Sequence, residues 1–243
     1  MAATTISIDL ISRIREFYTM AYQETLSNER EQAMPDNKIT DYAIPSYILA
    51  VAAVEAFVNE FILAIGSDFL TGSSFAKLSQ DEIQQFRKSN LGDKLIKLPA
   101  LVFDQEVFNR GRQPFQDMNY LINVRDSFVH YKMGFEAEYK GAFEYLIQKG
   151  IALNSPNGPS RFWVSDLSTV EGIRWAHNTA LKIMKEIIDT AIKTNRHPLL
   201  IAIGTKPTNF FHQIPDPSKN RELWLEWLKF HCKWEKVEKS KSG

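Results

Sequence analysis

Three side chains in the segment 120–131, YLINVRDSFVHY, have the chemistry that phosphodiester cleavage needs. Arg125 is a permanent cation that can hold a phosphate through paired N–H donors. His130 can accept or release a proton near neutral pH. Asp126 and His130 are four residues apart and share a helix face, so the carboxylate can accept a hydrogen bond from the imidazole and fix its tautomer. These groups are the minimum for metal-free cleavage.

Arg125 and His130 do not share a face of an ideal helix, because a separation of five residues turns their side chains roughly 140° apart. They can meet one substrate if the helix loosens near residue 130 or if they line opposite sides of a cleft. Gly134 suits a C-cap and predicts a helix end there. The alternative is that these residues are exposed surface residues at a solvated helix end and have no catalytic role.

The composition is typical of a globular protein, and its zero net charge gives no overall electrostatic attraction for polyanions. The chain has 243 residues, a hydrophobic fraction of 44% and a formal net charge of zero, so polyanion binding would need a local basic patch. A single cysteine, Cys232, excludes a disulfide framework and a cysteine-based metal site. No metal or cofactor is expected, and the low cysteine content makes a reducing cytoplasm the expected location. The absence of P-loop, dinucleotide, nucleophile-elbow and zincin motifs argues against those enzyme classes.

The apolar periodicity predicts an all-α antiparallel bundle of four to five main helices with short decorating helices. Long helices are expected over 6–27, from Pro45 at a first turn to Gly66, from Pro114 through the motif, and from a Ser168–Glu171 capping box onward. Short pieces are expected as helices over 79–89, 93–98 (stopped by Pro99) and 141–149, and as an extended piece over 161–164. An irregular strap over 195–217 and an aromatic helix over 219–236 follow.

Residues 44–66 are apolar enough to suggest a membrane span. Glu55, Asn59 and Glu60 lie near the middle of this run, and each would be costly in hydrocarbon. The N-terminus also lacks the basic and apolar regions of a signal peptide. The sequence therefore favours a buried core helix and no membrane association.

The segment RDSFVHY resembles the R-x4-6-H signature of HEPN domains, and AVAAVEAFVNEF, with its lone Glu55, resembles the second helix of many HEPN proteins. The resemblance covers roughly residues 8–195. It predicts a HEPN-like bundle over 1–195. The residues that follow predict a second region over 196–243, made of the strap, the aromatic helix and a disordered tail. The family is an all-α bundle that often dimerises, and many members are metal-independent endoribonucleases of toxin–antitoxin, abortive-infection or other defence systems.

The resemblance implies catalytic roles for Arg125, Asp126 and His130. Asparagine is the commoner family residue at the position of Asp126, and aspartate adds a negative charge near the phosphate. The His-x-Tyr continuation of one toxin branch is absent, because Tyr131 follows His130 directly. The chain is thus not expected to belong to that branch.

RNA supplies its own nucleophile, the 2′-OH, and cleavage needs this group deprotonated and the leaving 5′-oxygen protonated. One histidine cannot easily do both in the same step, so a homodimer with two facing motif helices is expected. The expected partners are RNA, a second copy and an antitoxin or other defence-system protein. The alternatives are a non-catalytic HEPN module that binds RNA, a nucleotide or a protein, and a purely structural protein.

Further residues are candidates for supporting roles. Glu55 is expected to be buried, either as a satisfied core carboxylate or as a support beneath the site. Ser127 and Tyr131 flank the motif and could touch phosphate, although Tyr131 could instead pack against the bundle. A basic RNA-facing rim, or simply a solvated charged surface, is predicted for Arg87, Lys88, Lys94, Lys97, Arg110 and Arg112.

The aromatic helix and the remaining histidines have less specific patterns. The spacing of Trp224, Trp227, Phe230 and Trp234 favours a docked helix over a base-stacking platform. His177, on the long helix after Ser168, is expected to be a polar-face or packing residue.

Overall fold

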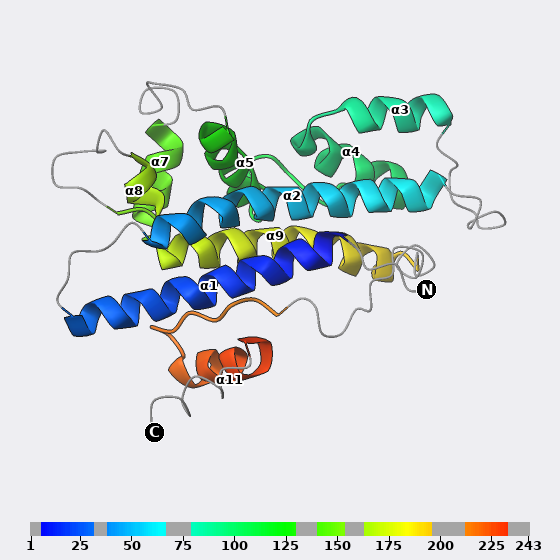
Figure 1. Ribbon diagram of the computed structural model, residues 1–243. Helices are drawn as coiled ribbons and strands as arrows, with labels where there is room; N and C mark the ends of the chain where they lie inside the picture. Colours follow the sequence, from blue (N-terminus) through cyan, green and yellow to red (C-terminus); the bar gives the residue numbers. More distant parts are fainter. Residues whose placement is uncertain are drawn as a thin grey trace. The chain divides into compact units, whose positions relative to one another are not determined.

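The computed structural model describes residues 6–31, 38–66, 79–129, 140–153, 163–195 and 212–232, and within these ranges it is helical and contains no strand. The predicted all-α class is therefore confirmed. Figure 1 shows the helices α1 (Ile6–Glu31), α2 (Lys38–Gly66), α3 (Gln80–Lys88), α4 (Leu91–Phe103), α5 (Phe115–Val129), α7 (Lys140–Gln148), α8 (Trp163–Leu167), α9 (Val170–Lys193) and α11 (Arg221–Cys232).

The chain forms two compact units, each assembled from separate stretches of sequence. The first unit comprises Met1–Ile11, Ala50–Ile122 and Thr179–His212. The second comprises Ser12–Leu49, Asn123–Asn178 and Gln213–Gly243. The predicted domain boundary near residue 195 stays a prediction, because residues 196–211 lie outside the described ranges.

Aromatic and aliphatic side chains from α2, α4, α5 and α9 make the core of the first unit. The Phe61 ring lies 6.0 Å from Phe57 and 5.9 Å from Phe103, between ring centroids. Along α9, the predicted apolar stripe is fully buried: Ile173, Ala176, Ala180, Ile183, Ile187 and Ala191. This stripe runs through both units, and its period of 3.6 residues is the pattern that identified the helix.

Pro45 and Pro99 lie inside helices, which corrects two predicted helix ends. α2 begins at Lys38, so Pro45 is not in its first turn. α4 begins after Asn90, whose side chain accepts a hydrogen bond from the Asp93 amide, and it continues past Pro99 to Phe103. Pro99 is buried with other apolar residues of α4. Packing of that face outweighs the cost of an interior proline, about 3 kcal/mol.

Two expectations near the start of α9 are wrong. Residues 163 and 164 open α8 instead of forming an extended piece. The cap of α9 is Thr169, whose Oγ1 accepts a hydrogen bond from the Gly172 amide at 2.8 Å. Ser168 instead donates to the Val164 carbonyl of α8, and Glu171 pairs with Arg174. Because Ser168 completes the short preceding helix, the cap moves one residue along the chain.

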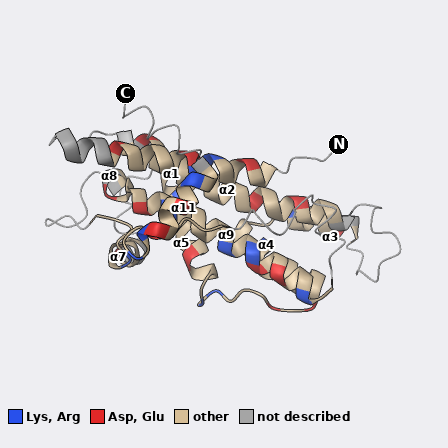
Figure 2. Ribbon diagram, turned by 90° about the horizontal axis from the view of Figure 1, so that it is seen from below, with Lys and Arg blue, Asp and Glu red and all other residues tan. Residues whose placement is uncertain are grey.

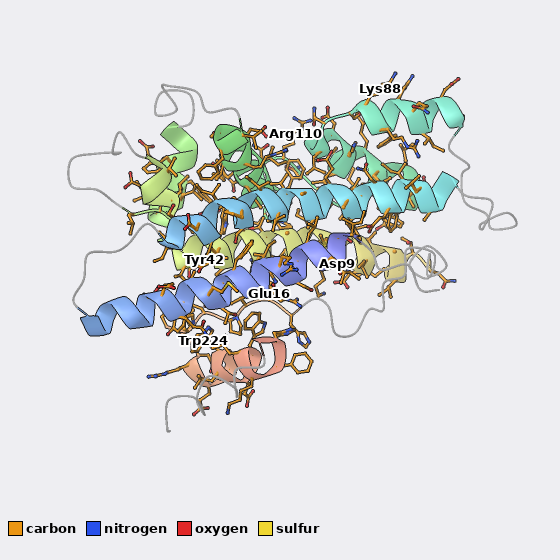
Figure 3. All side chains as sticks on the ribbon, in the orientation of Figure 1. Asp9, Glu16, Tyr42, Lys88, Arg110 and Trp224 are labelled. Carbon is orange, nitrogen blue, oxygen red and sulfur yellow. The ribbon has the colours of Figure 1, made fainter. Side chains whose placement is uncertain are left out.

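α11 docks on α1 in the second unit, as the aromatic spacing predicted. Trp224 donates a hydrogen bond from Nε1 to the Tyr18 hydroxyl at 3.0 Å, and Trp227 packs edge-on against the Tyr18 ring. Figure 3 shows Trp224 directed from α11 toward α1. Phe230 lies on the outer side of α11 with 66% of its surface exposed. Trp234 lies outside the described residues.

The apolar stretch Asp41–Ala64 of α2 is long and apolar enough to cross a membrane by length and composition alone. Within the protein, 56% of its most apolar window is buried. Core helices of soluble proteins meet the same criterion, so the burial fits the expected core helix.

Candidate functional site

Arg125 and Asp126 form the described part of the candidate site, near the end of α5 in the second unit. Their side chains are 27% and 42% exposed, and Arg125 Nε lies 2.8 Å from Asp126 Oδ1. The distance is that of an ion pair, yet Nε is covered from solvent and makes no hydrogen bond with any described residue. The N–H direction therefore misses the carboxylate, and the pair contributes charge without a directed bond.

The partner expected for Asp126 is His130. His130 and Tyr131 lie outside the described residues, as does Gly134. The Asp126–His130 hydrogen bond, the approach of Arg125 to His130 and the C-cap therefore stay predictions. Within the described residues, Asp126 pairs with the adjacent Arg125 guanidinium.

The last turns of α5 have one anchored face and one exposed face. Val124 and Ser127 are buried, and Phe128 packs on the aromatic ring of Tyr47 at 5.6 Å between centroids. Arg125, Asp126 and the 53% exposed Val129 make up the other face. The period of the helix thus presents the charged pair to solvent while apolar neighbours hold the helix.

Ser127 does not have the freedom that a phosphate contact needs. Its hydroxyl is buried and donates a hydrogen bond to the Asn123 carbonyl at 2.7 Å. This bond to the preceding turn is a common alternative for serine within a helix. The predicted phosphate contact is therefore corrected to a contact within α5.

In the first unit, Glu55 is expected to be buried and Lys94 to be exposed, and the structure shows the reverse. Glu55 is not buried, since 41% of its side chain is exposed, whereas the Lys94 side chain is only 3% exposed. Lys94 Nζ donates to Asn59 Oδ1 at 3.2 Å and lies 3.8 Å from Glu55 Oε1. The lysine stem is covered by the unit while its ammonium meets polar groups of α2, which removes Lys94 from the predicted rim.

The other predicted rim residues are exposed in the first unit: Arg87, Lys88, Lys97, Arg110 and Arg112. Figure 3 labels Lys88 on α3 and Arg110 in the loop that follows α4. Arg110 pairs with Asp93 at 2.6 Å, and Figure 2 shows basic and acidic residues together on α3 and α4. The rim is therefore mixed in charge, and it belongs to a different unit from Arg125.

A buried hydrogen-bonded relay in the second unit was not predicted. Arg15 Nε donates to His177 Nε2 at 3.0 Å, so the imidazole carries its proton on Nδ1, which donates to Asn178 Oδ1 at 3.0 Å. Asn178 holds the Ile214 backbone through two further bonds, of 2.7 Å to its amide and 2.9 Å to its carbonyl. The relay joins α1, α9 and the segment before α11.

Burial lowers the pKa of His177 to about 3, and the Arg15 charge adds to this effect. His177 is fully buried and neutral, so it is a packing residue and not a polar-face residue, which decides between the two expected roles. Its partner Arg15 is 162 positions away in sequence, and no local signal connects the two residues.

Among the described residues, no group of three or more histidine, cysteine, aspartate or glutamate side chains could hold a metal ion. No protein-family model, curated protein or solved structure matches the chain. A functional proposal therefore depends on the motif residues in the sequence, the exposure of Arg125 and Asp126, and the helical fold.

Proposed function

We propose that this chain is a metal-independent endoribonuclease of the HEPN type that acts as a homodimer in a toxin–antitoxin or antiviral defence setting. The observation that carries the proposal is the state of Arg125. Its Nε donor has no hydrogen bond among the described residues, while part of its side chain stays exposed beside Asp126. A partly exposed guanidinium on an anchored helix, with one donor unpaired, is suited to hold a phosphate.

In the proposed reaction, one His130 removes the proton of the 2′-OH, and the 2′-oxygen forms a bond to phosphorus. The bond from phosphorus to the 5′-oxygen breaks, and His130 of the second copy protonates that oxygen. Arg125 stabilises the charge on the phosphorane, and Asp126 orients the imidazole. The products are a 2′,3′-cyclic phosphate and a 5′-hydroxyl.

A non-catalytic HEPN module that binds RNA, a nucleotide or a protein partner is the second candidate. The position of Asp126 favours it, because its carboxylate is 2.8 Å from the guanidinium that would hold the phosphate. This negative charge competes with a phosphate for Arg125 and lowers the affinity for it.

The cleavage reaction predicts loss of activity in two variants. We expect Arg125→Ala and His130→Ala to reduce RNA cleavage about 100-fold or more in the presence of EDTA, since each removes one group that acts in the transition state. Cleavage of end-labelled RNA by the purified protein, with identification of the terminal phosphate, measures this.

The matched controls are Arg221→Ala and His212→Ala, which remove exposed residues of the same types far from the motif in sequence. Both should cleave like the wild type. Unchanged cleavage by His130→Ala, or loss of wild-type cleavage on adding EDTA, would contradict the proposal. RNA binding without cleavage by the wild type would select the second candidate.

A further inference from the structure

Tyr47 of α2 lies directly against the end of α5 that carries the motif. Its ring is fully buried and stacks on Phe128 at a centroid distance of 5.6 Å and an interplanar angle of 30°. Phe128 stands between Arg125 and His130 in the chain, on the anchored face of the helix. The direction of the Arg125 and Asp126 side chains therefore depends on how the Phe128 ring packs against Tyr47.

Three contacts fix the Tyr47 side chain itself. Its hydroxyl donates to the Leu167 carbonyl, at the end of α8, over 2.8 Å. Trp175 of α9 packs on its ring at 6.3 Å between centroids. At Gly172, an added Cβ would overlap the Tyr47 hydroxyl oxygen, so the close approach of this oxygen to α9 requires a residue without a side chain.

The hydroxyl stays a donor under ordinary conditions, because burial raises the pKa of Tyr47. The Leu167 carbonyl also accepts a hydrogen bond from the Thr169 amide at 2.9 Å, so it would keep one donor, and loss of the Tyr47 hydroxyl would remove one ordinary buried hydrogen bond, about 1 kcal/mol. The ring and its hydroxyl thus form a rigid link from the start of α9 to the last turn of α5.

Small rotations of α5 would matter for the site. A turn of about 20° about the helix axis moves an atom at a radius of roughly 6 Å by about 2 Å. Misplacement of a catalytic group by about 1 Å can lower a rate about 100-fold. A link that sets the rotation of this helix end therefore controls the geometry of the charged pair.

We infer that Tyr47, held by the Leu167 carbonyl and the space at Gly172, is a positioning residue for the Arg125–Asp126 site. This inference rests on the proposed ribonuclease function for its kinetic consequence. Its structural part, the ordering of the last turn of α5 by the Tyr47 hydroxyl, can be tested without any activity.

The test is Tyr47→Phe, which removes one oxygen and keeps the ring. We expect backbone amide exchange over residues 123–129 to become about 10-fold faster. The turnover number for RNA should fall about 10-fold while KM changes less than about twofold, because phosphate attraction tolerates a rotated guanidinium better than in-line attack does. Tyr42→Phe is the matched control, since its hydroxyl lies on the same helix and makes no hydrogen bond with described residues.

Unchanged exchange over 123–129 in Tyr47→Phe would overturn the inference. So would a lower melting temperature with an unchanged turnover number, since that is the result of a purely structural role. A wild-type protein that cleaves no RNA would instead overturn the proposed function, and the exchange measurement would still decide whether Tyr47 orders α5.

Discussion

Gly172→Ala is expected to destabilise the protein by about 4 kcal/mol, the largest effect that the described contacts predict for one methyl group. The new Cβ would overlap the Tyr47 hydroxyl oxygen and would also lie 3.0 Å from Thr169 Oγ1 and 3.1 Å from the Leu167 carbonyl oxygen. Tyr47 cannot move away easily, because its ring is fully buried between Phe128 and Trp175. Overpacking of this kind costs about 1–3 kcal/mol, and loss of the Tyr47 hydrogen bond adds to it.

A double-mutant cycle separates the overlap with Tyr47 from the helix's other constraints. In a Tyr47→Phe background the offending oxygen is absent, so Gly172→Ala should cost about 2 kcal/mol less than in the wild type. Some cost remains, because the new Cβ is still close to the Thr169 hydroxyl oxygen and the Leu167 carbonyl oxygen. Urea unfolding of the four proteins measures the cycle. Equal costs in both backgrounds would show that Tyr47 is not what excludes a side chain at residue 172.

Acid is expected to destabilise the second unit through His177. In the fold, burial and Arg15 lower the pKa of this imidazole to about 3, whereas an unfolded chain has the ordinary value of about 6.5. Between these values only the unfolded state binds the proton, so stability rises with pH in this window. Each pH unit below about 6.5 should remove about 1.4 kcal/mol, which gives about 2 kcal/mol between pH 7 and pH 5.

The groups that face His177 are Arg15 from α1, Asn178 from its own helix and His231 from α11. Protonation of Nε2 would oppose a hydrogen atom to the Arg15 N–H and add a second positive charge beside it. Urea unfolding at pH 5, 6 and 7 measures the slope. His177→Phe should be less stable at every pH, because Arg15 loses its acceptor, but its slope should be smaller by about 1 kcal/mol per unit. His212→Ala, which removes an exposed histidine, should keep the wild-type slope.

The elements that were predicted correctly are those whose signals are local. The apolar stripe of α9, the end of α7 before Gly150 and the docked face of α11 all follow from side-chain periodicity or backbone preference within a few residues. Gly150 has the positive φ of 69° that this end requires. The exposure of Arg125 and Asp126 is also a local consequence, since both lie off the apolar side of α5.

The corrections at Pro45, Pro99 and Lys94 have a common physical cause: long-range packing outweighs local preference. Pro45 and Pro99 are tolerated because the helices that contain them bury apolar faces. Lys94 is buried because α4 packs along α2, a contact 35 or more positions apart in sequence.

The chain's residues thus specify the helices, their buried faces and the charged motif, because each of these depends on neighbours within one or two turns. The hydrogen-bond partners of His177 and the packing site of Tyr47 depend on the tertiary structure. Their hydrogen bonds join residues 162 and 120 positions apart, and no periodic pattern encodes which buried polar group will meet which. Buried polar groups must find partners wherever packing brings a donor to an acceptor.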